Sequence, residues 1–364
     1  MKNTFGNSVC LTIFGESHGS SIGAVLDGLA PGISVNRDFI ASQMDKRRAK
    51  GQISTSRHEG DEVEISSGVF EDKTTGTPIC LTIKNNNTKS RDYSETRSLA
   101  RPGHADYTAN CKYHGYEDYR GGGHFSGRIT AGIVAAGAIA IDALKNKGIH
   151  IGTHIKRCAG ISDREFSDIA ADIRALEAVD FAVLDTDAAS QMHKAILSAA
   201  NEGDSVGGIL ETAVTGLPAG IGEPWFDTFE SVIAHILFSI PAVKGVQFGK
   251  GFDFADMRGS EANDEFELTE DSIRTRTNHN GGINGGITNG MPVIISCAVK
   301  PTPSIYKQQN TVDFINNKNT QIEIKGRHDP SIIHRARVVV DSAVALAICD
   351  MLALRFGTDW LKGN

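Results

Sequence analysis

The sequence lacks the paired cysteines that a disulfide framework or a structural zinc site requires. Its six cysteines are scattered along 364 residues, most of them inside apolar runs, and none forms a CxxC pair. This pattern is typical of buried free thiols in a reducing compartment. We therefore predict a cytoplasmic protein without disulfides and without a metal site.

A long uninterrupted apolar run is also absent. The longest stretch of small apolar residues, residues 129–144, contains Asp142 and is shorter than the ~20 residues needed to cross a bilayer. The first seven residues lack the apolar core of a signal peptide. We expect residues 129–144 to form a buried helix, and we expect no association with a membrane.

The sequence has no excess of positive charge. Its formal net charge is −7 and its pI is about 5.9. A chain with this balance is a poor nonspecific binder of nucleic acid, so we expect no nucleic-acid partner. Local clusters of basic residues stand out against the acidic average and are the first candidates for contact with an anionic ligand.

No fixed-period repeat, low-complexity block or Pro/Ser-rich linker divides the chain, so we predict a single domain over residues 1–364. Helical spacing of apolar residues predicts helices that start after Asn36, near Thr228 and near Arg337. Because strands and helices do not alternate one for one, the pattern favours an α+β fold over a doubly wound parallel sheet. Apolar runs predict strands at residues 9–14, 22–26, 63–65, 79–83, 209–214 and 292–299.

The segment GESHG at residues 15–19 follows the first predicted strand and matches the nucleophile elbow of serine hydrolases. That motif requires a helix after the turn, whereas the glycine-rich residues 20–28 predict a second strand. A serine hydrolase that uses Ser17 stays open as an alternative. Otherwise the segment is either a plain hairpin turn or a turn that presents Ser17 and His18 to a ligand.

Two further segments place basic side chains close together. Residues 46–58 hold several basic side chains and no acidic one. They form either a solvated face or a clamp for phosphate or carboxylate, for which the arginine fork is suited. In RPGHAD, residues 101–106, a tight turn separates Arg101 from His104, and histidine can donate a proton near neutral pH.

Glycine is abundant, at 39 of 364 residues, where roughly 7% is typical. RGGGHFSGR at residues 120–128 precedes the predicted helix, which Ser126 can cap, so free amides and the helix dipole predict an anion site there. GGINGGITNG at residues 281–290 either permits close backbone approach to a flat or phosphorylated ligand or forms a wide turn. Neither segment matches the phosphate loop of nucleotide triphosphatases or the dinucleotide fingerprint.

The segment RHDP at residues 327–330 lies just before the last predicted helix. Arg327 and Asp329 form either a structural ion pair or an anion contact beside a general base. A non-catalytic module that binds flavin or phosphate is a further alternative, but it leaves two histidines and an aspartate among the anion-binding segments unexplained.

Eight segments in this order resemble the chorismate synthase family over nearly the whole chain. They read GESHG, DKRR, SGVF with TTGTPI, RPGHAD, RGGGHFSGR, GGINGG with TNG, KPTPSI and RHDP. Each segment is weak alone, but eight in the family's order are specific. The resemblance implies a fold with helices sandwiched between antiparallel β-sheets and assembly as a homotetramer.

The resemblance also implies the reaction, which is conversion of 5-enolpyruvylshikimate 3-phosphate to chorismate. This is a 1,4-anti elimination of phosphate and a ring hydrogen that needs reduced FMN, although its net balance is redox-neutral. The substrate carries two carboxylates and a phosphate, so binding it requires several fixed donors. By resemblance, these substrate-binding residues are Ser17, Arg48, Arg101, Ser126, Arg128 and Arg327.

The same resemblance assigns three catalytic roles. His18 acts as an acid toward the leaving phosphate, and His104 donates toward the N1 side of the flavin. Asp329 assists the flavin N5 in taking the ring proton. The segments that match flavin contacts contain Ala242, Lys300, Ser304 and Arg327, together with residues 281–290.

The sequence departs from the family pattern after the double arginine. Many family members carry a further arginine within a few residues, whereas here the next arginine is Arg57. One phosphate contact is therefore either missing or supplied by Lys50 or Arg57. Because the chain lacks a dinucleotide fingerprint, we expect an external flavin reductant or reductase in preference to an intrinsic NADPH-dependent (NADP) activity.

Overall fold

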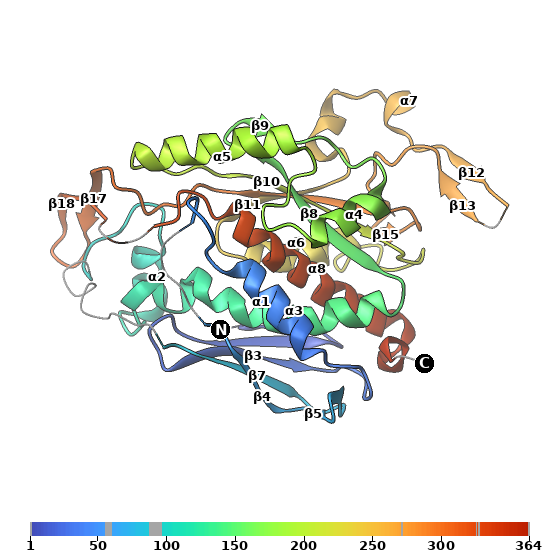
Figure 1. The fold of residues 1–364 in the computed structure, drawn as a ribbon, viewed down its shortest axis with the longest axis horizontal. Helices are drawn as coiled ribbons and strands as arrows, with labels where there is room; N and C mark the ends of the chain where they lie inside the picture. Colours follow the sequence, from blue (N-terminus) through green and yellow to red (C-terminus); the bar gives the residue numbers. More distant parts are fainter. Residues whose placement is uncertain are drawn as a thin grey trace.

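Two antiparallel sheets enclose a layer of helices in the computed structural model, which describes residues 2–54, 60–86, 97–270, 272–324, 326 and 328–362 (Figure 1). The first sheet has the strand order β1-β2-β3-β7-β4, and the second has the order β11-β16-β10-β8-β9. This arrangement confirms the predicted α+β class with helices between antiparallel sheets. The first sheet contains β1 (Thr4–Phe5), β2 (Cys10–Gly15), β3 (Ser21–Asp27), β7 (Ile79–Lys84) and β4 (Val63–Ser67); the second contains β11 (Val243–Phe248), β16 (Val293–Val299), β10 (Gly208–Thr215), β8 (His150–Cys158) and β9 (Ile161–Ser162).

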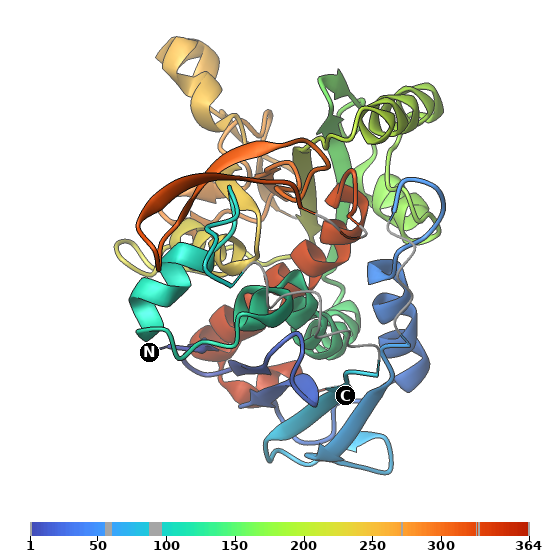
Figure 2. The same cartoon turned by 90° about the vertical axis from the view of Figure 1, so that its left-hand side faces the viewer.

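Four helices lie between the sheets, and two more cover the outer side of the second sheet. The inner helices are α1 (Arg37–Arg47), α3 (Thr130–Lys145), α6 (Phe229–Ser239) and α8 (Ile333–Phe356), and the outer ones are α4 (Ile169–Glu177) and α5 (Thr186–Asn201). Figure 2 faces the end of the molecule where α2 (Asp106–Tyr113) lies beside the hairpin of β17 (Gln309–Asp313) and β18 (Lys318–Ile322). Smaller elements are β5 (Val69–Phe70), β6 (Lys73–Thr74), η2 (Arg120–Phe125), η3 (Gly127–Ile129), η4 (Gly251–Asp256), α7 (Gly259–Ala262), β12 (Phe266–Leu268), β13 (Ile273–Thr275), β14 (Ile283–Asn284), β15 (Ile287–Thr288) and η5 (Thr358–Leu361).

The centre of the helical layer is the crossing of α3 and α8. A Cβ added at Gly137 would lie 2.2 Å from the Cβ of Ser342, so only glycine allows the two helices to approach this closely. The stretch Gly127–Lys145 is long and apolar enough to span a membrane, but 89% of its most apolar window is buried inside the protein. This burial confirms the buried helix predicted at residues 129–144.

Local sequence signals fix several helix starts. Asn36 Oδ1 accepts a hydrogen bond from the amide of Phe39 at 2.9 Å and caps α1, as predicted. Thr228 Oγ1 accepts from the amide of Ser231 at 3.0 Å and caps α6. Helix α8 starts at Ile333, four residues before the predicted start at Arg337. The predicted strands are all present, whereas β8, β11 and the outer helices are additional.

The cysteines only partly follow the prediction of buried thiols. All six are free; Cys158, Cys297 and Cys349 are buried, whereas Cys111 on α2 is exposed. Burial raises the pKa of the Cys158 thiol to about 11, so this thiol stays protonated and unreactive at neutral pH.

A buried histidine joins the second sheet to the segment that leads into α4 and α5. His154 on β8 has an exposed fraction of 0%, and its Nδ1 lies 2.6 Å from Asp163 Oδ2. Its Nε2 lies 3.3 Å from Glu211 Oε1 on β10. Burial by itself lowers the pKa of His154, but the two carboxylates outweigh it and raise the pKa above its usual 6.5.

We predict that this contact makes stability depend on pH. Because the pKa of His154 is higher in the folded protein than its usual 6.5, the contact adds stability that is fully present below pH 6.5. This stability is lost as the pH rises through the folded-state pKa of His154. His154→Gln should cost about 1–3 kcal/mol at pH 6 and flatten the decrease in stability above that pH. Urea unfolding between pH 6 and 9 measures both effects, with His150→Gln, an exposed position on the same strand, as the control. Equal pH slopes in the wild type and His154→Gln would contradict the prediction.

Candidate active site

The turn between β2 and β3 buries the side chains of Ser17 and His18, whereas Glu16 and Ser20 are exposed. The exposed fractions of Ser17 and His18 are 3% and 7%. The amide of Ser17 donates to the carbonyl of Gly123 at 3.1 Å, and His124 Nδ1 lies 2.8 Å from the carbonyl oxygen of Gly15, to which it donates. The GESHG and RGGGHFSGR segments, far apart in the sequence, therefore form one unit.

Glycines 121–123 make this contact possible. All three have positive φ, with values of 59°, 83° and 53°. A Cβ added at Gly121 would lie 2.3 Å from the His18 ring and 3.0 Å from Ser17 Oγ. The left-handed backbone and the close approach both demand glycine, so the glycine run holds the His18 imidazole against the backbone of η2.

Arg128 is buried by its position at the start of the core helix. Ser126 Oγ accepts a hydrogen bond from the amide of Arg128 at 3.3 Å and caps η3, the short turn that leads into α3. Arg128 Nε donates to Asn85 Oδ1 at 3.2 Å. The amide group of Asn85 donates in turn to the carbonyls of Glu16 and Gly19, at 3.0 and 2.9 Å. Arg128 is thereby linked to the turn that carries His18.

One carboxylate joins the two most buried arginines of this region. Asp61, 6% exposed, contacts Arg128 through Oδ1 and Arg47 Nη1 through Oδ2, the latter at 3.1 Å. Arg47 Nε also donates to Thr130 Oγ1 at 3.1 Å. The C-terminal end of α1 and the N-terminal end of α3 are therefore connected through a buried Arg–Asp–Arg cluster.

The sequence motif pointed to Arg48, whereas the neighbouring Arg47 has the buried position. The Arg48 side chain is 38% exposed and pairs with Asp45 at 3.2 Å. Lys50 pairs with the same carboxylate at 2.6 Å and with Asp180 at 2.9 Å. The alternative candidate Arg57 lies outside the described residues. Helical spacing was the available signal for Arg47, since it lies on the face of α1 that also buries residues 40, 43 and 44.

Asp329 lies next to the same cluster. Its Oδ2 pairs with Arg335 Nη1 at 2.7 Å, and Arg335 Nε donates to the backbone carbonyl of Arg47 at 2.8 Å. The expected ionic neighbour, Arg327, lies outside the described residues. Sequence reasoning missed Arg335. This residue lies in the first turn of α8 and connects the last turn of α1 with the RHDP segment.

His104 belongs to a second group of side chains. Its Nε2 lies 2.9 Å from Ser304 Oγ, and its Nδ1 lies 3.1 Å from the carbonyl oxygen of Pro102. Lys300 Nζ donates to the carbonyl of Gly103 at 2.6 Å. The backbone amide of Lys300 donates to the carbonyl of Ala242 at 2.9 Å. The four predicted residues His104, Ala242, Lys300 and Ser304 are therefore neighbours.

Charge and burial keep the His104 ring neutral. Burial, followed by the positive charge of Arg101, lowers the pKa of His104 from 6.5 to about 4. Arg101 itself is held by Asp106 in a bidentate contact at 2.8 and 2.7 Å. At neutral pH, His104 is therefore uncharged, with its one N–H on Nδ1 donating to the carbonyl of Pro102 and its Nε2 accepting from the Ser304 hydroxyl.

The structure links the two groups through the loops that precede α8. Tyr306 lies two residues beyond Ser304, and its hydroxyl donates to the carbonyl of Gly326 at 2.8 Å. The amide of His328, next to Asp329, donates to the same hydroxyl at 3.4 Å. The glycine-rich residues 281–290 are not brought to this region, because β15, which they contain, and α2, which follows His104, lie on opposite sides of the molecule in Figure 1.

The second group offers a polar environment that a flavin could complete. The hydroxyl of Thr302 is buried and has no hydrogen-bond partner among the described residues, and along the chain Thr302 lies between Lys300 and Ser304. An unmatched buried hydroxyl is costly unless a ligand pairs with it. The donor set therefore fits a flavin. Over the described part of the chain, no three His, Cys, Asp or Glu side chains are grouped to hold a metal ion.

Buried guanidinium groups, two imidazoles on glycine-hinged turns and a carboxylate are side chains typical of an enzyme that acts on an anionic substrate. The model of the chorismate synthase family matches residues 9–353. The chain is similar to chorismate synthases of Dehalococcoides mccartyi (48% identical, covering 98% of each chain) and Pyrococcus abyssi (44% identical, covering 96% of this chain and 97% of the relative). Its fold is similar to a crystal structure of chorismate synthase, with a TM-score of 0.76 at 27% identity, covering 97% of this chain and 94% of the other.

The chain belongs to the chorismate synthase family. Its activity is that of the family, a carbon–oxygen lyase acting on a phosphate ester, and the family uses a flavin cofactor. The serine hydrolase alternative finds no support. The turn that carries Ser17 leads into strand β3, whereas a nucleophile elbow leads into a helix.

We predict that the Arg47–Asp61–Arg128 cluster contributes strongly to stability. Asp61→Asn keeps a residue type that tolerates the positive φ of 43°, but it leaves two buried arginines without their shared negative charge. The expected loss is about 3 kcal/mol of unfolding free energy, measured by urea unfolding.

The matched control is Asp45→Asn. This change breaks the pairs of Asp45 with Arg48 and Lys50, in which the Asp45 side chain is 44% exposed. Exposed pairs of this kind contribute less than about 1 kcal/mol. Equal losses of unfolding free energy in Asp61→Asn and Asp45→Asn would contradict the prediction that the buried cluster stabilises the fold more than the exposed pairs do.

Proposed function

We propose that the protein converts 5-enolpyruvylshikimate 3-phosphate to chorismate by 1,4-anti elimination of phosphate, with reduced FMN as the flavin. The observation that carries the proposal is the junction of the Ser17–His18 turn, the 120–128 loop and Arg128 through Gly121 and Asn85. It supports a site in which an acid and several fixed cations act on one anionic substrate.

We propose that the substrate anions bind between the two groups of side chains. Arginine provides planar donors that remain charged at all relevant pH values, which suits two carboxylates and a phosphate. The substrate-binding residues are proposed to be Ser17, Arg48, Arg101, Ser126, Arg128 and Arg327. Arg47 positions Arg128 through Asp61 and is not proposed to touch the substrate.

His18 is proposed to donate a proton to the leaving phosphate. Phosphate leaves more readily when it is protonated or hydrogen-bonded than with its full charge. The glycine run fixes the imidazole, so the donor is oriented before the substrate arrives. General acid help of this kind contributes about 10²–10⁴-fold to the rate.

His104 is proposed to donate an N–H hydrogen bond toward the N1 side of the flavin. Its pKa of about 4 keeps the ring neutral in the free protein, where Nδ1–H donates to the Pro102 carbonyl. Donation from Nε2 would therefore require a proton on that nitrogen, which negative charge developing on a bound flavin would favour. A bound reduced flavin would supply electron density that eases C–O cleavage. Ala242, Lys300, Ser304 and Arg327 are proposed to hold the flavin, and Thr302 adds an unmatched hydroxyl to the same segment.

Asp329 is proposed to assist removal of the ring proton on the flavin side of the substrate. Its contact with Arg335 at 2.7 Å orients the carboxylate, and Arg335 holds the last turn of α1 at the same time. The cations on α1 and the carboxylate at the start of α8 are thereby kept at a fixed spacing.

We further propose a cytoplasmic homotetramer that receives reduced flavin from an external reductant or reductase. Large apolar side chains remain exposed in the single chain, among them Trp225, Phe226, Phe252 and Leu268, at 78%, 91%, 82% and 83%. Contiguous exposed apolar surface favours association with other chains. An NADPH-dependent (NADP) activity within the chain is not proposed, since the sequence has no dinucleotide fingerprint.

The proposed function is tested by an anaerobic assay of the purified protein with 5-enolpyruvylshikimate 3-phosphate and reduced FMN. We expect equal amounts of phosphate and chorismate. Phosphate is measured by its release and chorismate by its absorbance. Oxidised FMN should give no turnover. Phosphate release without chorismate, or no turnover with reduced FMN, would contradict the proposal.

We predict that His18→Ala and His104→Ala each lower turnover by at least about 10-fold. Each change removes one positioned donor and leaves a cavity at a loop, so the melting temperature should change little compared with turnover. Steady-state rates under anaerobic conditions measure the effect. His114→Ala, at the end of α2, is the control. Wild-type turnover in both variants would remove the roles assigned to these histidines.

A further inference from the structure

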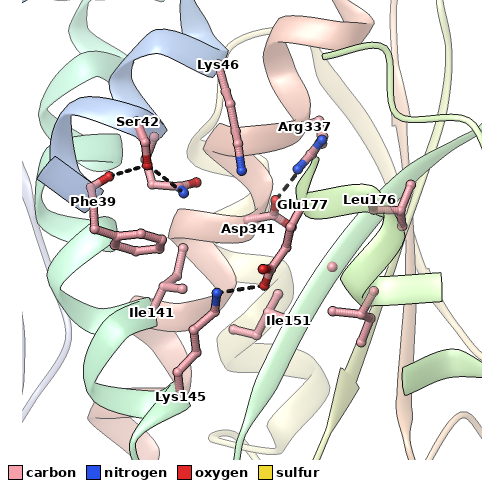
Figure 3. A pocket seen from close by; sticks show the side chains of 13 residues that line it. Phe39, Ser42, Lys46, Ile141, Lys145, Ile151, Leu176, Glu177, Arg337 and Asp341 are labelled. Carbon is pink, nitrogen blue, oxygen red and sulfur yellow. Dashed lines mark hydrogen bonds and ion pairs between the residues drawn. The ribbon is translucent and has the colours of Figure 1, made fainter. Parts of the chain in front are cut away.

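A cleft of about 210 Å³ lies between α1, α3, α4, α8 and strand β8, and none of the proposed site residues lines it. Figure 3 shows it from close by, with side chains from all five elements directed toward its interior. In the described part of the chain, β8 pairs with β10 on one side and with β9 only at its last residues. The cleft therefore lies at the edge of the second sheet, where Ile173 of α4 packs over Gly152 of β8.

The charges in this cleft do not balance. Three cations, Lys46, Lys145 and Arg337, line it together with two acids, Glu177 and Asp341. Lys145 pairs with Glu177 at 2.6 Å near the opening. Burial raises the pKa of Asp341 above its usual range, and burial together with the charge of Arg337 lowers the pKa of Lys46. The charge balance therefore rests on the three cations and two acids in the lining. The excess is positive, so the cleft favours an anion.

Two of the cations have unused bonding capacity. No carboxylate of the described residues lies within ion-pair distance of the Lys46 ammonium group, which points into the cleft in Figure 3. Arg337 is 4% exposed and uses Nη1 for the carbonyl of Val179 at 3.0 Å. Its buried Nε has no hydrogen-bond acceptor among the described residues, and the nearest Asp341 oxygen is 3.5 Å away. An acceptor in the cleft would satisfy both cations.

Most of the remaining lining is apolar and consists of Phe39, Ile141, Ile151, Ile173 and Leu176, with Gly152 at the sheet edge. Ser42 and Gln43 on α1 add two polar side chains, and the Ser42 hydroxyl donates to the carbonyl of Phe39 at 2.7 Å. An apolar cavity of about 150 Å³ holds benzene, so 210 Å³ has room for a ring with one carboxylate. A phosphate or acetate ion would occupy the charged part of the cleft and leave its apolar side chains in contact with water.

We propose that this cleft binds a compact organic acid, in which a carboxylate contacts Lys46 and Arg337 and an apolar body of about ring size packs against the isoleucines. The site is separate from the proposed chemistry and does not depend on it. The cleft shares two helices with the candidate active site, because Lys46 precedes Arg47 on α1 and Arg337 lies two residues after Arg335 on α8. A ligand held here touches the two helices that carry the Arg–Asp–Arg cluster and the Asp329 contact.

Benzoate is a suitable probe, since it has one carboxylate and one ring. We expect titration calorimetry on the full chain to show one saturable site with a Kd of about 1 mM or lower. Acetate, which lacks the ring, and benzyl alcohol, which lacks the charge, should bind at least 10-fold more weakly. Equal heats for benzoate and acetate would overturn the proposal, because the apolar lining would then have no part in binding.

The deciding variant is Lys46→Met, which keeps the packing of the side-chain stem and removes the charge. We expect benzoate affinity to fall at least 10-fold, while Lys194→Met, an exposed lysine on α5, leaves it unchanged. Because benzoate could also enter the candidate active site, Arg128→Lys is measured in parallel. Binding that survives Lys46→Met and is lost in Arg128→Lys would overturn the proposal.

The position of the probe is checked directly by crystals soaked with 4-bromobenzoate. The proposal expects an anomalous bromine peak among the apolar side chains of the cleft, with the carboxylate toward Lys46. A peak only near His18 or His104 would assign the binding to the other site and overturn the proposal. Neither the calorimetry nor the crystal soak requires turnover, so their outcome is distinguishable from that of the activity assay.

Discussion

The carboxylate of Asp61 between Arg47 and Arg128 is the contact on which the candidate site depends. Guanidinium groups at this burial are stable only beside a negative charge. Asp61 supplies it to both and so fixes the end of α1 against the start of α3. Through Asn85, the same arrangement reaches the turn of His18. A site for a multiply charged anion thus contains one built-in anion that keeps its cations in place before the substrate arrives.

Two kinds of electrostatic environment are combined in the site. Around Arg128, positive charge is held close to its counter-charge and is partly shielded from water. Around His104, burial and the charge of Arg101 favour the neutral ring and lower its pKa to about 4. The first environment suits the binding of anions, and the second suits a donor that does not bring a further charge next to a cofactor.

Much of the fold and part of the site could be predicted from the sequence. Apolar runs and cap residues identify the strands and the starts of α1 and α6, because these depend on neighbours along the chain. The segments GESHG and RGGGHFSGR identify His18 and Arg128. Asp61 could not be found, because it stands outside any motif and gains its role only when α1 and α3 meet. The buried position of Arg47 follows from the helical face of α1, which the letters of the motif around Arg48 do not contain.

The hydrogen bond from Arg335 to the carbonyl of Arg47 joins the last turn of α1 to the first turn of α8. These helix ends belong to the rigid core, where α8 is buried along most of its length. Because Arg335 also pairs with Asp329, the cations at the end of α1 and this carboxylate keep their spacing together with the core. Any opening that lets a ligand in falls instead to the strap of residues 300–306 that holds His104, since the glycine run holds the His18 turn in place.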